Sequence, residues 1–308
     1  MITHGPASGP SDAHPRILGA VRALREAGIA SAVTMTGLAS ATSEHGALEV
    51  VDDERSISAV LAPLGFGEVA PGRGPERLFV AYDAADDRWL RLRLLMGHRP
   101  TRRSTIGATG LRSARRGMRA IRGNASLWVA LLGPDGTGKS SLAAGLARSL
   151  AVPVSRFYGG LYPAGRRRYR LPGVGTAATL IRLWRTTALA TFASRRGRVV
   201  IFDRHPLDAA LPIQGAGRLH RWRSAILARA CPRPDLLVVL DAPVDVLHGR
   251  RREQPAEVLE VQRRSYAALA RTIPASIVVD ATNELDDVRR HLTDVIWRAY
   301  AERRARES

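Results

Sequence analysis

Lysine is nearly absent from this 308-residue chain: of its 47 basic residues, only Lys139 is not an arginine. Cysteine is equally scarce, and the single Cys231 cannot form an internal disulfide, which is typical of a reducing cytoplasm. No apolar run reaches the length of about 18 residues that a membrane span needs. Residues 1–15 also lack the apolar segment of an export signal. We therefore expect a cytoplasmic protein without a transmembrane segment.

Acidic and aromatic residues are also in short supply. The chain has 28 acidic residues, a net charge of +19 and an aromatic content of 5%. Such basicity usually suggests a nucleic-acid partner, but single-stranded nucleic acid is bound on stacked aromatic platforms, and none is visible in this sequence. We therefore expect no nucleic-acid partner and interpret much of the charge as a solvated arginine surface.

The first third of the chain predicts a small α+β domain, residues 1–98. Helical spacing of apolar residues marks two segments, and strand-like runs mark four others: 16–27 and 56–64, then 32–35, 48–51, 78–82 and 89–95. Residues 99–126 contain eight arginines and no acid. We interpret this segment as an Arg-rich linker, either a solvated connector or a strip that docks on a membrane surface or polyanion.

Residues 127–308 show a different pattern, in which buried-type strands alternate with segments of helical length. The predicted strands are 127–132, 199–202, 236–240 and 276–279, and the predicted helices are 140–150, 177–192, 244–252, 256–271 and 286–303. Continuous apolar strands that alternate with helices are typical of an α/β fold, in which helices cover both faces of a parallel sheet.

Residues 133–140 read GPDGTGKS and match the phosphate-loop pattern G-x-x-x-x-G-K-[ST] between a predicted strand and a predicted helix. In such a loop, backbone N–H groups and the helix N-terminus bind phosphate oxygens, the lysine bridges the β- and γ-phosphates, and the hydroxyl after it ligates Mg²⁺. The only lysine of an arginine-rich chain lies in this position, where the wide planar fork of arginine fits poorly. We expect ATP to be held by Gly133, Asp135, Gly136, Thr137, Gly138, Lys139, Ser140 and Ser141.

Three later segments accompany the loop. Residues 199–205 read VVIFDRH and place Asp203 and Arg204 at the carboxyl end of a strand, where ligands bind in open α/β sheets. Residues 234–251 run from PDLLVVLDAP into a helix that ends in arginines, and residues 276–282 read SIVVDAT. Together with the phosphate loop, these segments resemble the thymidylate kinase family of P-loop kinases over residues 127–303.

The resemblance implies a nucleoside-monophosphate-kinase type of fold and a role for each matching residue. Asp203 would hold Mg²⁺ together with Ser140, Arg204 would contact the transferring or acceptor phosphate, and Asp135 would face the acceptor. Arginines after the 234–241 strand would begin a lid over ATP, and the late loop would lie beside the adenine; these are Arg250, Arg251 and Arg252, and Asp280, Ala281 and Thr282. A homodimer is also common in the resembled family.

The acceptor is the point at which the sequence departs from the resembled family. Thymidylate kinases carry an Arg-Glu-Pro-Gly-Gly-like element after the second strand, whereas this chain reads VSRFYGGLY at 154–162. Between Asp135 and Asp203 there are 11 arginines and no acid, which would suit an anionic acceptor. We expect Asp135, Arg156, Tyr158 and Arg204 to bind it.

Three functions fit these observations. The first is an ATP- and Mg²⁺-dependent kinase for a phosphate acceptor, with a nucleoside monophosphate as the first expectation. The second is a kinase for a sugar, lipid-linked or natural-product acceptor, in which Asp203 or Asp135 would serve as base. The third is a non-enzymatic ATP-dependent switch or assembly protein that uses the 99–126 linker.

The N-terminal segment faintly resembles the nucleotidyltransferase-like domains that are fused to such kinases. Active members need closely spaced carboxylates on the second strand to hold a metal. Here that run reads HGALE at 45–49, without the pair. We therefore expect a degenerate domain with a binding, regulatory or structural role.

Overall fold

The computed structural model describes residues 14–29, 45–50, 54–69, 76–96, 126–161, 174–211, 217–250 and 254–307. The chain divides into two compact units, residues 1–112 together with 293–308, and residues 113–292. The predicted strand at 32–35 and the predicted linker up to residue 125 lie outside the described residues. No helix of the described part is long and apolar enough to cross a membrane.

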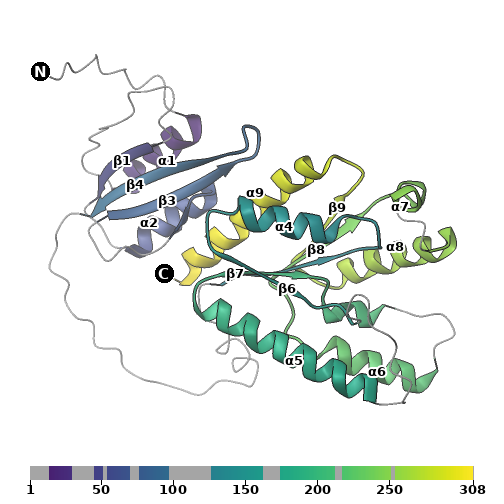
Figure 1. Ribbon diagram of the computed structural model, residues 1–308. Helices are drawn as coiled ribbons and strands as arrows, with labels where there is room; N and C mark the ends of the chain where they lie inside the picture. Colours follow the sequence, from purple (N-terminus) through teal and green to yellow (C-terminus); the bar gives the residue numbers. More distant parts are fainter. Residues whose placement is uncertain are drawn as a thin grey trace, which may run out of the picture. The chain divides into compact units, whose positions relative to one another are not determined.

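The first unit contains a four-stranded mixed sheet with the order β1-β4-β3-β2. Its strands are β1 (His45–Val50), β2 (Gly67–Glu68), β3 (Glu76–Asp83) and β4 (Arg88–Met96); β1 runs parallel to β4, and the other pairs are antiparallel. The helices are α1 (Pro15–Glu26), α2 (Glu54–Leu61) and the short η2 (Ala62–Leu64). The predicted α+β architecture is confirmed (Figure 1).

Apolar residues on alternate strand positions build the core of this unit. Phe79 and Ala81 of β3, with three leucines of β4, pack against the apolar stripes of α1 and α2, which contribute Ile17, Ala20, Val21, Leu24, Ile57 and Leu61. Successive strand residues point to opposite faces of a sheet. Val80, Tyr82 and Trp89 therefore belong to the face that α1 and α2 do not cover.

That second face is covered by the C-terminal part of α9 (Leu285–Glu307). Trp297 is fully buried, and its indole N–H lies 3.1 Å from the carbonyl oxygens of both Gly65 and Val80. Its ring packs edge-on against Trp89 at a centroid distance of 4.9 Å. We expected residues 127–308 to form one domain, but residues 293–308 belong to the first unit because this tryptophan is part of its core.

The second unit contains a five-stranded sheet with the order β6-β7-β5-β8-β9, in which every pair is parallel. The strands are β5 (Trp128–Leu132), β6 (Val154–Tyr158), β7 (Val199–Asp203), β8 (Leu236–Asp241) and β9 (Ser276–Asp280). The helices are α4 (Lys139–Ser149), α5 (Val174–Arg195), the short η3 (Pro206–Ala210), α6 (Arg218–Ala228), α7 (Val244–Arg250), α8 (Ala256–Arg271) and the start of α9. The predicted α/β parallel sheet is confirmed.

Helices cover both faces of this sheet, with α4 and the first turns of α9 on one side and α5 on the other (Figure 1). The central strands β5, β7 and β8 are buried along almost their whole length, which explains their continuous apolar sequences. Trp128, Phe202 and Tyr266 are the largest side chains of the core on the α5 and α8 side. This packing fixes the carboxyl ends of the strands, where the expected site residues lie.

Candidate functional site

The loop after β5 has the backbone that a phosphate cradle requires. Gly133, Gly136 and Gly138 all have positive φ angles, of 140°, 93° and 80°. A Cβ atom on Gly133 would lie 2.3 Å from the carbonyl oxygen of Leu240 on β8, so only glycine fits there. Gly138 is the N-cap of α4, which begins at Lys139. The loop therefore turns sharply into a helix N-terminus, a natural binding site for phosphate.

Lys139 lies inside this loop and is only 6% exposed. Its ammonium group donates to the carbonyl oxygens of Gly133 and Pro134, at 2.8 and 2.6 Å, and lies 3.3 Å from the hydroxyl oxygen of Thr137. Burial, together with the nearby Arg204, lowers the pKa of Lys139 to about 8, whereas Asp135 opposes the shift. The ammonium is still charged at neutral pH, so the loop presents one buried cation to a phosphate group.

Two side chains whose oxygen atoms could ligate a metal ion lie near this cation. Ser140 is exposed on the first turn of α4, directly after Lys139. Asp203 ends β7 and pairs in register with Leu131 of β5, the strand that leads into the loop. Hydroxyl and carboxylate oxygens are ligands that Mg²⁺ prefers. The donor set of Ser140 and Asp203 therefore fits the expected metal, which would neutralise charge on a triphosphate.

A cavity of about 270 Å³ lies on one side of the loop. The loop and the start of α4 form one wall, and α7, the segment after β9 and the start of α9 form the other. The lining residues are Gly136, Thr137, Gly138, Ser141, Leu142, Arg250, Ala281, Asn283, Leu285 and Val288. The Arg250 guanidinium donates to the carbonyl oxygen of Ala281 at 2.8 Å. The structure thus brings Arg250 and Ala281 together with the phosphate loop, as predicted.

The neighbours of Ala281 are placed differently from our expectation. Asp280 accepts hydrogen bonds from the backbone N–H and the hydroxyl of Thr282, at 2.8 and 2.7 Å, and so closes a local turn. Neither residue lines the cavity, because their side chains are used in this turn. Asn283, the residue directly after Thr282, lines the cavity instead. Arg251 and Arg252, the other expected lid arginines, lie outside the described residues.

The ends of β6 and β7 pack closely against each other. Gly159 and Gly160 follow β6; a Cβ atom on Gly159 would lie 2.6 Å from the carbonyl oxygen of Arg204, and one on Gly160 would lie 2.9 Å from its Cδ. Arg204 itself has a left-handed φ of 65°, unusual for a residue other than glycine. On α5, Arg182 donates to the carbonyl oxygens of Gly160 and Leu161, at 2.5 and 3.1 Å. These contacts place the Arg204 side chain above the sheet edge.

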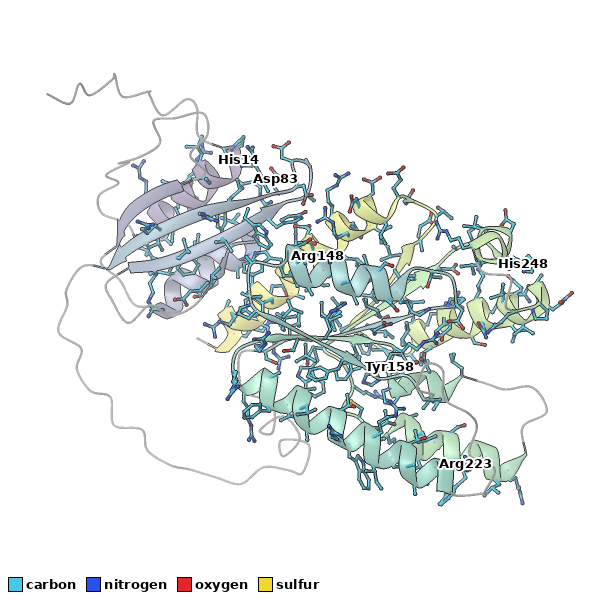
Figure 2. The ribbon with its side chains drawn as sticks, viewed as in Figure 1. His14, Asp83, Arg148, Tyr158, Arg223 and His248 are labelled. Atoms are coloured by element: carbon cyan, nitrogen blue, oxygen red, sulfur yellow. The ribbon has the colours of Figure 1, made fainter. Side chains whose placement is uncertain are left out.

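A second cavity, of about 740 Å³, lies on the other side of the phosphate loop. Its lining comes from the loop, the carboxyl ends of β6 and β7 with η3, and one face of α8: Asp135, Tyr158, Leu161, Arg204, Asp208, Leu211, Gln254, Glu257, Val258, Val261, Gln262, Ser265 and Tyr266. Figure 2 labels Tyr158, at the end of β6. This is the edge of a parallel sheet at which ligands bind in α/β folds.

Asp135 connects the phosphate loop to this larger cavity. It forms an ion pair with Arg204 and lies 3.9 Å from the Lys139 ammonium. The Gln254 side chain lies 3.5 Å from its second oxygen, and Gln262 donates to Gln254 at 2.9 Å. Three of the four expected acceptor residues, Asp135, Tyr158 and Arg204, therefore meet in one cavity.

Arg156, the fourth expected acceptor residue, does not line this cavity. It lies in β6 two residues before Tyr158, and its side chain is exposed. A rise of about 3.3 Å per strand residue puts it well back from the edge where the cavity opens. Our expectation for Arg156 is therefore not supported by its position.

Asp208 and Tyr266 are site residues that the sequence did not reveal to us. The Tyr266 hydroxyl donates to Asp208 Oδ1 at 3.1 Å. Burial raises the pKa of Asp208 to about 6, although Arg204 and this hydrogen bond oppose the shift. Asp208 is the next acidic residue after Asp203, only five positions further along the printed sequence. This proximity was a usable signal, but Tyr266 had none, because its helix reads as an ordinary amphipathic helix.

His205 holds the backbone that carries Asp208. The imidazole is fully buried; its Nδ1 accepts from the Leu207 N–H at 3.2 Å, and its Nε2 lies 3.2 Å from the Pro232 carbonyl oxygen. Both ring nitrogens are thus used, which makes His205 the cap of η3 and not a reacting group. Within the DRH segment, Arg204 therefore lines the larger cavity, Asp203 ends β7 without lining either cavity, and His205 fixes the turn.

A cluster in the first unit brings potential metal ligands together. One ligand atom each from His14, Asp83 and Asp86 lie within 4.8 Å of one another. His14 and Asp83 already pair at 2.8 Å, which ties the start of α1 to the end of β3 (Figure 2), and Asp86 pairs with Arg88 at 2.8 Å. These interactions account for the cluster as a structural feature.

No protein-family model matches the sequence, and no curated protein does. Among solved structures, thymidylate kinase from Candida albicans is similar at 17% identity and a TM-score of 0.45, over 57% of this chain and 91% of that chain. Deoxyadenosine kinase from M. mycoides is similar at 14% identity and a TM-score of 0.41, over 53% of this chain and 95% of that chain. The sheet order and the loop after β5 identify the α/β P-loop fold without these similarities.

Proposed function

We propose that this chain is an ATP- and Mg²⁺-dependent kinase that transfers the γ-phosphoryl group to a small-molecule acceptor. One observation carries the proposal: a single phosphate loop lines two cavities, with Gly136–Gly138 facing the smaller one and Asp135 the larger one. A nucleotide in the smaller cavity would direct its phosphates across the loop toward an acceptor in the larger one. This arrangement suits in-line transfer.

The charged residues around the loop suit the charge that develops during such a transfer. Lys139 would neutralise the β- and γ-phosphates, and Ser140 with Asp203 would hold Mg²⁺. Arg204 would approach the transferring group from the acceptor side, and Arg250 would lie over the nucleotide. Because little covalent chemistry is asked of the protein in phosphoryl transfer, positioning and preorganised charge supply most of the rate enhancement.

Two acceptor classes are compatible with this chemistry. The resemblance to thymidylate kinases suggests a nucleoside monophosphate, whose phosphate would bind Arg204. The altered segment after β6 suggests the alternative, a sugar, lipid-linked or natural-product acceptor with a hydroxyl as the nucleophile. A phosphate acceptor needs no base, whereas a hydroxyl acceptor does.

Lys139→Arg tests the proposed function. The planar guanidinium cannot occupy the space in which the ammonium bonds Gly133 and Pro134, so we expect phosphoryl transfer to fall by at least about 100-fold. ADP release and nucleotide binding would be measured on variants with unchanged unfolding temperature. Arg148→Lys is the matched control, because Arg148 is exposed near the other end of α4 (Figure 2). Turnover near wild type in Lys139→Arg would refute the proposal.

A further inference from the structure

The described side chains that line the larger cavity carry more negative than positive charge. Among its described lining residues, the carboxylates Asp135, Asp208 and Glu257 face one guanidinium, that of Arg204. Arg204 is already paired with Asp135, so its charge is largely neutralised by a neighbour. Among these described side chains, a phosphate dianion would meet three carboxylates and one guanidinium, and like charges at close range are costly.

The remaining surface of this cavity is largely apolar. Leu161 and Leu211 come from the ends of the β6 and η3 segments, and Val258 and Val261 project from α8. Both valines are more than a third exposed, although they lie on the face of α8 that lines the cavity. Such walls gain free energy by covering a ring or another apolar surface of a ligand.

Asp208 is a carboxylate of this cavity that has room for a ligand. Its Oδ1 accepts from Tyr266, and its Oδ2 receives no hydrogen bond from any described residue. Asp135 differs, because both of its oxygens already face donors, Arg204 on one and Gln254 on the other. An ionised carboxylate accepts hydrogen bonds, so Asp208 is suited to bind a hydrogen-bond donor, such as a hydroxyl group, of the molecule that is phosphorylated.

We propose that the acceptor is a hydroxyl compound without a phosphate group, and that Asp208 binds the reacting hydroxyl and takes its proton. This inference rests on the proposed function. In the step, the bond between the γ-phosphorus and the β,γ-bridging oxygen breaks, and a bond forms between the γ-phosphorus and the acceptor oxygen. The hydroxyl proton passes to Asp208 and then to solvent, and the products are a phosphate monoester, ADP and a proton.

The surroundings of Asp208 suit a base at neutral pH. Four groups face it: Tyr266 from α8, Arg204 from the end of β7, and Lys139 and Asp135 from the phosphate loop. Burial nevertheless raises its pKa to about 6, so the carboxylate is ionised at pH 7 but remains basic enough to accept a proton. Burial and Asp208 raise the pKa of Tyr266, so that the phenol stays protonated and can donate.

Matched acceptor pairs test the inference directly. Each pair consists of a hydroxyl compound and its phosphate ester, for example thymidine with thymidine 5′-monophosphate and a hexose with its 6-phosphate. Steady-state ADP release would be measured with the full chain, ATP and Mg²⁺. We expect kcat/KM to be at least about 10-fold higher for the hydroxyl member of a pair that is turned over. A preference for the phosphate member would overturn the inference while leaving the proposed kinase function standing.

Asp208→Asn separates a base from a structural residue. Asparagine keeps the hydrogen bond from Tyr266 but cannot accept a proton, so we expect kcat with the hydroxyl acceptor to fall by about 100-fold or more. Nucleotide binding should not change, and Asp208→Glu should recover part of the rate. Wild-type kcat/KM should fall as the pH drops below about 6, and Asp208→Asn should lack this acidic limb.

Asp245→Asn is the control, since Asp245 is exposed on α7 and lines neither cavity. If Asp208→Asn retains kcat and the acidic limb, Asp208 is not the base and the inference fails. ATP binding without ADP release for any pair would instead contradict the proposed kinase function. The two failures are therefore distinguishable.

Discussion

Individual residues of the phosphate loop explain why the chain has kept its only lysine. The Lys139 ammonium makes three short contacts inside a loop that is closed on one side by β8. A compact tetrahedral cation can satisfy these contacts, whereas a planar fork needs more width. The sequence made the importance of this position visible, because every other Lys-or-Arg position in the chain is occupied by arginine.

Gly133→Ala should weaken nucleotide binding. Its Cβ would lie 2.3 Å from the Leu240 carbonyl oxygen at a φ of 140°, so the loop would have to move away from β8. We expect nucleotide affinity to fall by at least about 10-fold, with a loss of about 1–3 kcal/mol in the free energy of unfolding. Calorimetric titration and thermal unfolding would measure the two effects.

Gly197→Ala separates backbone strain from the close approach. Gly197 also has a positive φ, of 73°, but a Cβ atom there would meet no atom within 4 Å. It should therefore lose stability without losing nucleotide affinity. If Gly133→Ala and Gly197→Ala bound nucleotide with equal affinity, the close approach of the loop to Leu240 would not be what nucleotide binding requires.

At the scale of elements, the carboxyl end of β6 is held by a helix and not by its own sheet alone. β6 is one of the two edge strands of the sheet, and among the described strands it pairs with β7 alone. Arg182 on α5 donates to the carbonyl oxygens of Gly160 and Leu161, which follow β6. The wall of the larger cavity therefore depends on a contact from a helix residue 21 and 22 positions further along the sequence.

Arg182→Ala should loosen this wall. We expect KM for the acceptor to rise by about 10- to 100-fold, because a hydrogen bond from a charged group is worth about 1.5–3 kcal/mol and each 1.4 kcal/mol corresponds to about a factor of ten. KM for ATP should be unchanged, since the smaller cavity has no contact with Arg182. Arg185→Ala on an exposed position of the same helix is the control. A rise in both KM values would mean that the effect is general destabilisation.

The sequence predicted the three central strands of the second sheet and one of its two edge strands. The strands at 127–132, 199–202 and 236–240 are confirmed, because buried parallel strands have long apolar runs, and the edge strand at 276–279 and the helix at 256–271 are confirmed as well. β6 and α6 were not predicted. β6 reads VSRFY and has neither a continuous apolar run nor a regular alternation, and α6 carries arginines and exposed Leu219 and Trp222, so neither shows the pattern of a buried element.

The candidate site followed the same division. The phosphate loop, Asp203 and Arg204 could be predicted because their chemistry depends on local spacing. Asp208 and Tyr266 come together over 58 residues of sequence, through the packing of α8 beside η3. No local pattern contains that information. Arg156 was misplaced for the related reason that spacing along a strand does not show where a cavity opens.

At the scale of the whole molecule, one helix contributes to both compact units. Residues 285–292 of α9 belong to the second unit, where Leu292 is fully buried, and residues 293–307 belong to the first, where Trp297 is fully buried. Two cores therefore depend on one continuous element. Helical periodicity predicted the element, but not that its two halves serve different cores.

Substitutions at these two positions should destabilise different units. Trp297→Ala should lower the stability of the first unit by about 3–5 kcal/mol, and Leu292→Ala that of the second by about 2–5 kcal/mol. Hydrogen exchange, measured for β3 and β4 and for β5 and β8, would report each unit. Each variant is the control for the other. Equal loss of protection in both units after either substitution would contradict the division.

The burial of Trp297 also sets an order of events during synthesis. Its hydrogen bond to Gly65 joins residues 232 positions apart in the sequence. The ribosome makes the strands of the first sheet early, and a domain usually folds soon after its residues emerge. Here the tryptophan that completes the core is made 217 residues after Val80 of β3. The first sheet must therefore wait until the whole second unit has been made, and products truncated before residue 297 cannot complete its core.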